Sequence, residues 1–560
     1  MGLYLSEMEI IKRFRLLPSL WGTVEDIVVV TLYVYMYFTN KGQGDDVSVM
    51  LFSWVKLMLV GYFLLRFLFQ VGGRIAHSLI ILAIELAAVY ESALGILQIL
   101  GVVESNNYLF PCTGTFDNPG PLGGFLAVSI CVSLAEIFAI NSHGNVEISP
   151  FFERVILRVS YLTVFFCVVI LPSTQSRAAW LSIMVSAVYY SIKSCNALLG
   201  IKIHWLLSIT FIIVILLFVF LFKRPSSKGR FITYKMEWIT IKRNGFKGVG
   251  LGHFSNAYGN TQRDYFSRTI TIQDGELRYN DSDKERIYAD NPNVGFNDYF
   301  QFGIEFGVGP LIILLLLVAL ILYRLSKLHS PFFYGMVSML VFAFFSYPFS
   351  LWEFLVVFLA FAAYAGNTSD MSDSSKTCSL FFAFSCLFPL TFLYKSVDIV
   401  ITSYNTEKLW KRERFIFESK DYQSYEYCCS QIYPNMQSNC AFLYEYAYSL
   451  FKIGDIVESE KKLRQSLALS GNSLSFILLG DIHKMQGMIT EAEQDYFNSF
   501  LALPDRLYPL YKLAVLYHDT NQKVKYQEMV RSIENFHPRI ESQSTKEIRE
   551  MLNELMFADE

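Results

Sequence analysis

The chain has 560 residues, of which 53% are apolar, 16% are aromatic and only 17% are charged, and its formal net charge is −3. Soluble domains carry about 25% charged residues, so this composition excludes an ordinary soluble protein over most of the length. The nine cysteines show no Cys-x-x-Cys pair and no spacing typical of a metal site. We expect no metal, no other cofactor and no nucleic-acid partner.

The first two-thirds of the chain predicts about eleven membrane-spanning helices, because a helix needs about 20 apolar residues to cross a bilayer. The predicted spans are 21–39, 48–70, 75–100, 121–141, 152–172, 177–193, 203–222, 297–323, 332–348, 351–366 and 378–397. Lys12, Arg13 and Arg15 precede the first span in the order typical of an uncleaved N-terminal helix.

The distribution of basic residues predicts the orientation, because cytoplasmic loops collect Lys and Arg. The loops on the side of the basic N-terminus carry Arg74, Arg154, Lys193–Lys202 and Arg324–Lys327. The opposite short loops, near 101–119, 173–176 and 348–351, contain no Lys or Arg. The N-terminus is therefore expected inside the cell, and the C-terminus in the periplasm or outside the cell.

This orientation divides the chain into four parts. The predicted membrane-spanning helices and the helical C-terminal part together indicate an all-α fold. Transmembrane helices occupy 1–222 and 296–400, a long external loop occupies 223–295, and an external helical domain occupies 405–560. The short polar motifs of the chain all lie on the outer side, where neither ATP nor a pool of sugar nucleotides exists. A transferase on that side must take its donor already activated on a lipid.

The C-terminal part predicts helical repeats with a period of 33 to 34 residues. Small residues and turn residues recur at this spacing, and prolines end successive units: Ala447, Gly480 and Ala514; Asp421, Gly454 and Gly487; Pro434, Pro504 and Pro538. This pattern resembles about four tetratricopeptide repeats, which bind peptides or partner proteins; the alternative is a generic helical cap. One disulfide among Cys428, Cys429 and Cys440 is an option.

Two arginines on the outer side are candidate ligands for a diphosphate. Arg177 follows Ser173-Thr174-Gln175-Ser176 at the end of a span, and its planar fork matches phosphate oxygens. The alternative is that Arg177 snorkels toward water. Arg230 opens an amphipathic segment in the loop 223–295, which carries thirteen Lys and Arg against eight Asp and Glu. That excess suits a lipid-linked diphosphate, although anionic headgroups would also be attracted.

Two further motifs supply polar residues. The run Gly248-Val249-Gly250-Leu251-Gly252 lacks the strand and helix of a nucleotide site, and the His253 that follows is either a base or a surface histidine. Asn297, Gln301 and Glu305 share one helical stripe beside Asp298, and such a stripe points to a cavity. The alternative for Asn297 is a helix cap.

Together with Thr113-Gly114-Thr115-Phe116-Asp117-Asn118-Pro119, these motifs resemble the O-antigen ligase superfamily, which includes O-antigen polymerases and bacterial protein O-oligosaccharyltransferases. The match covers about residues 109–320. Its most specific parts are the stretch from Gly229-Arg230 to Phe254 and the pattern Asn297-x-Tyr299-Phe300-Gln301-x5-Gly307.

The resemblance implies a GT-C-like helix bundle that transfers a glycan from undecaprenyl diphosphate to an acceptor hydroxyl without a metal. It implies that Arg177 and Arg230 hold the donor diphosphate, and we expect Asn118, Asn297 and Gln301 to line the pocket. The family often has His-Asn where this chain has Phe296-Asn297. Asp298, His253 and Glu305 are the substitutes for the missing base, and Asp298, expected to be ionised, is favoured.

The sequence therefore predicts an inverting glycosyltransferase of the bacterial inner membrane that acts on the periplasmic face. The acceptor is the lipid A core in a ligase, a second lipid-linked chain in a polymerase, or a protein in an oligosaccharyltransferase. A transporter of lipid-linked sugars is the alternative of another class, because Glu85 and Glu91 lie within predicted spans. A protein partner at the C-terminal repeats is a further expectation.

Overall fold

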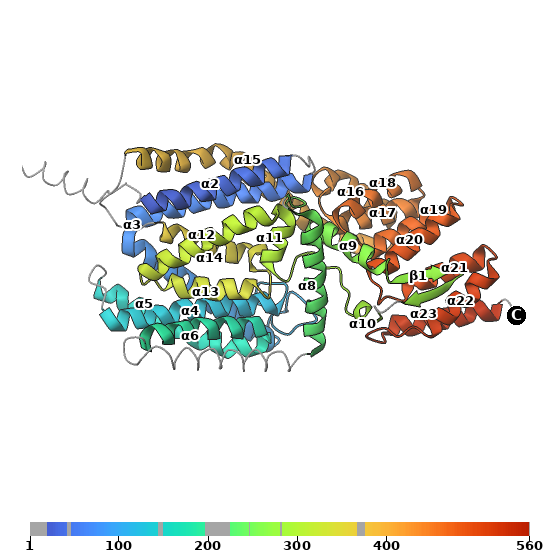
Figure 1. The fold of residues 1–560 in the computed structure, drawn as a ribbon, viewed down its shortest axis with the longest axis horizontal. Helices are drawn as coiled ribbons and strands as arrows, with labels where there is room; N and C mark the ends of the chain where they lie inside the picture. The colour runs from blue at the N-terminus through green and yellow to red at the C-terminus, as the bar shows by residue number, and fades with distance from the viewer. Residues whose placement is uncertain are drawn as a thin grey trace, which may run out of the picture.

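The computed structural model describes residues 20–41, 46–143, 149–195, 224–245, 247–279, 283–366 and 376–558. These residues form helices almost throughout, so the predicted all-α class is confirmed. A bundle of apolar helices lies at one end of the long axis and a stack of shorter helices at the other, and α8 stands between them (Figure 1).

The membrane part contains the longest and most apolar helices. Its elements are α2 (Leu20–Lys41), α3 (Asp46–Ile99), α4 (Pro119–His143), α5 (Pro150–Ile170), η1 (Leu171–Thr174), α6 (Arg177–Cys195), α11 (Asp298–Phe306), α12 (Val308–Lys327), α13 (Phe332–Ala343), η2 (Pro348–Ser350) and α14 (Trp352–Ala365). Four segments of the described chain are long and apolar enough to cross a membrane: Leu51–Ile99, Pro119–Ser142, Pro150–Thr174 and Val308–Lys327. These helices give the chain the character of a membrane protein.

Three predicted spans differ from the observed helices, in each case at a glycine. The spans 48–70 and 75–100 run together in α3, where Gly73 has φ 50° and ψ −127° and breaks the helical path. The single span 297–323 is wrong, because Gly307 with φ 91° separates α11 from α12. The predicted span 203–222 lies outside the described residues.

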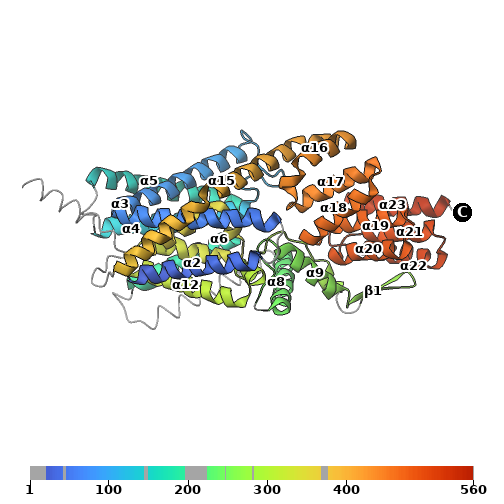
Figure 2. The ribbon, with the colours of Figure 1, turned by 90° about the horizontal axis from the view of Figure 1, so that it is seen from above.

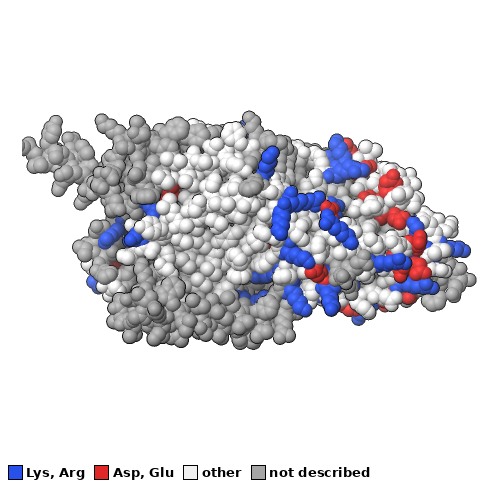
Figure 3. All heavy atoms as spheres, viewed as in Figure 1, with Lys and Arg blue, Asp and Glu red and all other residues white. Residues whose placement is uncertain are grey.

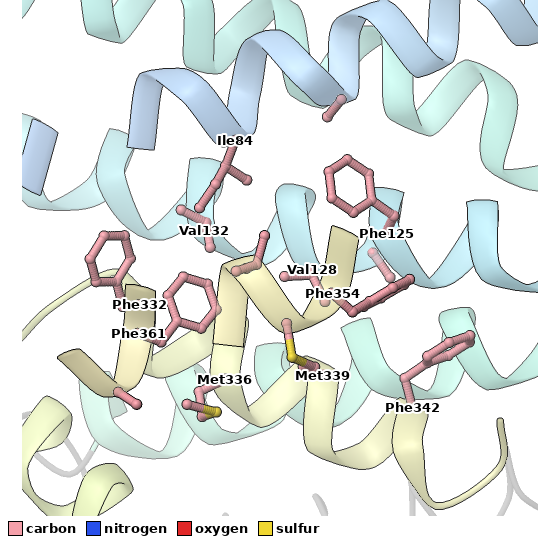
Figure 4. Close-up of a cluster of buried hydrophobic side chains, with 14 of the residues drawn as sticks. Ile84, Phe125, Val128, Val132, Phe332, Met336, Met339, Phe342, Phe354 and Phe361 are labelled. Atoms are coloured by element: carbon pink, nitrogen blue, oxygen red, sulfur yellow. The ribbon is translucent and has the colours of Figure 1, made fainter. Parts of the chain in front are cut away.

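The core of the membrane part is aromatic and aliphatic. Phe125 and Val128 of α4 face Met339 of α13 and Phe354 of α14 (Figure 4). The rings of Phe342 and Phe354 stack with centroids 5.9 Å apart. Close packing of this kind fixes how α4, α13 and α14 sit against one another.

A buried ionic network joins α2, α3 and α12. The guanidinium of Arg66 donates to both carboxylate oxygens of Asp26 at 3.1 Å. Tyr62 donates to Asp26 at 2.8 Å, and Arg324 donates to Glu25 at 3.3 Å. These side chains are nearly inaccessible to solvent. Sequence reasoning placed Arg324 in a cytoplasmic loop and did not recognise the pairing.

The C-terminal helices form antiparallel pairs. They are α15 (Lys376–Glu418), α16 (Tyr422–Met436), α17 (Cys440–Ile453), α18 (Ile456–Leu469), α19 (Ser473–Met485), α20 (Ile489–Ala502), α21 (Tyr508–Asp519), α22 (Lys523–Glu534) and α23 (Gln543–Ala558). Helix α15 runs without a break across the domain boundary expected near residues 400–405.

The turn within each helix pair contains one residue with positive φ. These residues are Lys420, Gly454, Gly487 and Asn521, and they recur every 33 or 34 residues. The first member is therefore Lys420 and not Asp421, which instead caps α16. Pro434 lies inside α16 and does not end a unit. Cys428, Cys429 and Cys440 are free thiols, so the disulfide considered among them is not formed.

The loop 223–295 is folded and shares a core with the C-terminal helices. It contains α8 (Arg224–Asn244), α9 (Phe254–Phe266), the antiparallel strands β1 (Ile270–Gln273) and β2 (Glu276–Tyr279), and α10 (Asp283–Arg286). Figure 2 shows α8, α9 and β1 along one flank, beside α20 and α22.

Hydrogen bonds and apolar packing join this loop to the C-terminal helices. The side chain of Gln262 donates to the carbonyl of Ala502 at 2.7 Å, and the amide of Leu277 donates to Ser532 Oγ at 3.0 Å. Phe266 and Phe500 belong to the same buried cluster. The loop and the C-terminal helices must therefore lie in the same compartment.

Candidate functional site

Arg177 is the first residue of α6. The short helix η1 and Gln175, with φ 49°, turn the chain from α5 into α6. Gly123 of α4 allows this turn to approach, because a Cβ there would lie 2.7 Å from both Ser176 Cβ and Thr174 Oγ1. Arg177 is thus half-buried at the end of the bundle that faces α8.

Arg230 reaches the same place from α8. Its Nη1 donates to the carbonyl of Phe345 at 2.9 Å, and its Cζ lies 5.6 Å from the centroid of the Phe296 ring. Burial and the nearby charge of Arg230 lower the pKa of Arg177. The two arginines nominated from sequence are therefore close enough to act on each other electrostatically. Two like charges held together form a site that favours an anion between them.

The motif Thr113–Pro119 is held by side chains of α3. Gln98 Oε1 accepts from the amides of Thr113 and Gly114 at 2.9 and 2.8 Å. The carboxylate of Glu91 accepts from the amide and the hydroxyl of Thr115 at 2.9 and 2.6 Å. Glu91, which had favoured a transporter, therefore supports this loop.

The exposed end of that motif faces the arginine site. Burial and the carboxylate of Asp117 raise the pKa of Tyr347, whereas Arg230 lowers it. Asp117, Tyr347 and Arg230 are therefore near one another. Asn118 accepts from the amide of Gly120 at 3.0 Å, which ties its side chain to the start of α4.

The glycine motif docks on the end of α11. The amides of Val249 and Gly250 donate to the carbonyls of Ile304 and Glu305 at 2.9 and 2.8 Å. Gly248 has φ 68°, and a Cβ there would lie 2.4 Å from the Glu305 carbonyl oxygen. The glycine is required both by its conformation and by this close approach.

The carboxylate of Glu305 fastens the same contact. Burial raises its pKa to about 7, and hydrogen bonds from the amides of Gly252 and Phe254 and from Gln301 oppose that rise. Its oxygens are thus engaged by the backbone of the glycine motif. This geometry gives Glu305 a supporting role.

Asn297 and Gln301 also hold backbone. Asn297 caps α11, with its Oδ1 accepting from the amides of Tyr299 and Phe300 at 3.0 and 3.1 Å. Gln301 Oε1 accepts from the amide of Gly295 at 2.9 Å. Both side chains shape the turn before α11, and their expected contact with a ligand stays a prediction.

Asp298 is buried at the start of α11. Its Oδ2 accepts from the amide of Phe349 at 2.9 Å, which joins α11 to η2. Burial raises the pKa of Asp298 well above its usual range, and the charge of Glu305 adds to the rise. Burial removes hydration from the carboxylate and so acts against the expectation that Asp298 is ionised at neutral pH, which stays a prediction.

His253 lies at the other end of α8. It precedes α9 and lines a cavity of about 510 Å³ together with Arg243, Asn256 and Asp264. Arg230 and Arg243 are separated by about 20 Å along the helix, at 1.5 Å per residue. Arg230 and the cavity that His253 lines therefore lie toward opposite ends of α8.

Glu237 is a buried carboxyl that the sequence analysis did not nominate. It lies two turns after Arg230 on α8, and a Cβ on Gly295 would be 3.1 Å from its Oε1. Burial raises the pKa of Glu237 to about 8, the amide of Phe296 lowers it, and Asp298 raises it further. The signal in the sequence was its i+7 spacing from Arg230, which puts both residues on one face.

The described residues thus define a membrane protein in which the segment 223–295 and the C-terminal helices lie at one end of the helix bundle. No cluster of three His, Cys, Asp or Glu side chains suited to a metal occurs within the described ranges. Comparisons with models of protein families, with curated proteins and with solved structures find no match to this chain.

Proposed function

We propose that this protein is a metal-independent inverting glycosyltransferase of the O-antigen ligase type. It acts at the outer face of a bacterial inner membrane, with about eleven spans and periplasmic tetratricopeptide-like repeats. The donor is a glycan on undecaprenyl diphosphate, and the acceptor is a hydroxyl of the lipid A core. The observation that supports the proposal is that Arg177 and Arg230, which come from separate helices, interact electrostatically as like charges.

The reaction forms one bond and breaks another. The acceptor hydroxyl oxygen attacks the anomeric carbon, and the bond from that carbon to the diphosphate oxygen breaks. The diphosphate leaves with the electron pair, and its charge is stabilised by the two guanidinium groups. The hydroxyl proton passes to a base, for which Asp298 is the proposed group because it lies at the start of α11, which packs against α8, the helix of Arg230.

Two alternatives use the same chemistry with another acceptor. A protein O-oligosaccharyltransferase or an O-antigen polymerase would employ the same arginines. The shared core of the outer loop and the C-terminal helices supports a protein partner or acceptor on that side, because it places a large helical surface next to the site. A transporter of lipid-linked sugars is less well supported, since Glu91 is engaged by the Thr115 backbone.

The decisive experiment deletes the gene and then analyses surface polysaccharide and glycoproteins in parallel. A ligase gives free lipid-linked glycan and an uncapped lipid A core, a polymerase gives short chains, and a protein transferase gives unmodified proteins. The purified protein, reconstituted in liposomes, should transfer glycan from the undecaprenyl diphosphate donor. Transport of that donor without any transfer would refute the proposal.

A further inference from the structure

A large groove lies at the seam between the outer loop and the C-terminal helices. Strand β2 and helix α10 form one wall, and α22 with the segment 535–540 forms the other. Its volume is about 1150 Å³, which is larger than the cavity beside His253. The groove exists because the β-hairpin leans on α22, where the Leu277 amide donates to Ser532 Oγ.

The lining of the groove is basic. It contains five side chains that are cationic or can become so, against two carboxylates: Lys284, Arg286, Arg531, His537 and Arg539, against Glu276 and Glu528. Glu528 is paired with Arg531 at 2.7 Å, and Glu276 is paired with Arg278 at 2.7 Å. The pair with Glu528 also cancels the charge of Arg531, and Arg286 lies 3.8 Å from Asp505. The excess of positive charge that attracts an anion therefore comes from Lys284 and Arg539.

The basic wall is held rigidly. Arg286 is buried, and its Nη1 and Nη2 donate to the carbonyls of Pro504 and His537 at 3.3 and 3.2 Å. Its Cζ lies 5.0 Å from the ring centroid of Tyr279 and 4.4 Å from that of Phe536. Because these side chains are already ordered, binding a ligand costs less conformational entropy than it would at a flexible wall.

A line of cations leads from the groove to the arginine pair. Arg539 Cζ lies 5.2 Å from the ring centroid of Tyr288, and Lys228 Nζ lies 5.7 Å from the same ring. Lys228 is two residues before Arg230 on α8. Figure 3 shows Lys and Arg gathered around the junction between the two halves of the molecule, with Asp and Glu mainly over the C-terminal helices.

We propose that this groove binds an acidic glycan, an oligosaccharide that carries carboxylate groups on its sugar rings. This assignment rests on the proposed function, because the glycan is the part of the donor that extends from the clamped diphosphate. The carboxylates lie against Lys284 and Arg539, and the ring of Tyr288 packs against a sugar face. The cationic line through Lys228 guides the chain from the diphosphate site into the groove.

Binding to the full-length protein in nanodiscs tests the proposal with three probes. They are an oligosaccharide of glucuronic acid, a neutral glucose oligosaccharide of the same length, and an oligoglutamate peptide. The glucuronic acid oligosaccharide should bind best, and its affinity should fall steeply with salt. Lys284→Glu and Arg539→Glu should each weaken it about tenfold or more. Lys461→Glu, an exposed charge reversal on α18, should leave it unchanged.

Three outcomes would overturn the assignment. They are equal binding of the neutral oligosaccharide, unchanged binding by both groove variants, and equal or tighter binding of oligoglutamate, which would make the groove a peptide site. Lys284 is exposed, so its variant should retain the fold, and thermal unfolding checks this.

Arg177→Ala separates this inference from the proposed function. It should abolish glycan transfer and leave glucuronic acid binding intact. If the unaltered protein binds the oligosaccharide through the groove but performs no transfer, the groove assignment stands and the proposed function is refuted. If it performs transfer but does not bind the oligosaccharide, the proposed function stands and the groove assignment is refuted.

Discussion

The two ends of the membrane bundle each hold a pair of arginines, and their surroundings differ. Arg66 and Arg324 face the carboxylates of Asp26 and Glu25 in a buried network. At the other end, Arg230 bonds to a backbone carbonyl and lies on an aromatic ring, while its charge lowers the pKa of Arg177.

The difference suggests different uses for the same residue type. A buried arginine whose charge is matched by a carboxylate joins helices and has little to offer a ligand. Two arginines that act on each other as like charges are stabilised when an anion binds. Only the second arrangement suits a diphosphate.

The largest expected effect is a loss of stability when the ion pair between Arg66 and Asp26 is broken. Arg66→Ala leaves Asp26 buried without its guanidinium, which should reduce the free energy of unfolding by about 3–5 kcal/mol. The double change Arg66→Met with Asp26→Leu removes both charges and should cost much less. Thermal and chemical unfolding of the purified protein in detergent would measure both. Equal losses from the single and double changes would show that charge matching is unimportant there.

Substitutions of Arg177 and Arg230 should lower the rate of glycan transfer and leave the stability of the protein unchanged. Arg177→Lys and Arg230→Lys keep the charge and lose the bidentate fork, and each should slow glycan transfer by about 10²–10³-fold. The level of folded protein should not change. Arg154→Lys, an exposed change at the start of α5, is the matched control. Near-normal transfer by Arg177→Ala would end the assignment.

The base candidates should differ from one another in effect. Asp298→Asn keeps an oxygen that accepts from the Phe349 amide, so the fold should survive while transfer falls about 10²-fold. His253→Gln should have a mild effect, because the cavity that His253 lines lies at the far end of α8 from Arg230. Glu305→Gln should disturb the glycine motif more than the chemical step. Equally mild losses from all three would mean that orientation and the arginines suffice.

The contact between the glycine motif and α11 should be sensitive to one methyl group. Gly248→Ala places a Cβ against the Glu305 carbonyl at positive φ and should cost about 1–3 kcal/mol. Gly229→Ala is the matched control, since a Cβ there meets no atom within 4 Å. Unfolding curves and transfer rates of the two variants should separate. A tolerated Gly248→Ala would show that the motif does not need this approach.

The smallest effect concerns pH. The folded-state pKa of Glu237, about 8, exceeds the ordinary value of 4.5, so the native state holds an extra proton between these values. The contribution of Glu237 to the free energy of unfolding is fully present below pH 4.5, its ordinary pKa, and is lost as the pH rises through the folded-state pKa of about 8. Thermal stability should therefore fall from about pH 5 to about pH 9. Glu237→Gln should flatten that slope, and an unchanged slope would assign it to other groups.

The sequence predicted the helical class and most of the apolar segments, because long apolar runs have few other stable conformations in lipid. It also nominated Arg177 and Arg230, which act on each other as like charges. It placed the boundary between α11 and α12 wrongly, because an apolar run does not show that Gly307 adopts a positive φ.

The sequence also missed the burial that raises the pKa of Asp298, and it overlooked Glu237. Both errors have the same cause. The pKa of a carboxyl depends on what surrounds it, and its neighbours in space come from distant parts of the chain.

The sequence by itself determined where apolar segments lie, which loops are basic and which residues recur every 33 or 34 positions, since all of these are properties of local composition and spacing. Only the tertiary structure decided which charges meet. It paired Arg66 with Asp26, brought Arg230 within electrostatic range of Arg177 and laid the segment 223–295 on the C-terminal helices. These contacts join residues far apart in the chain, and they depend on close packing of whole helices, which no local pattern encodes.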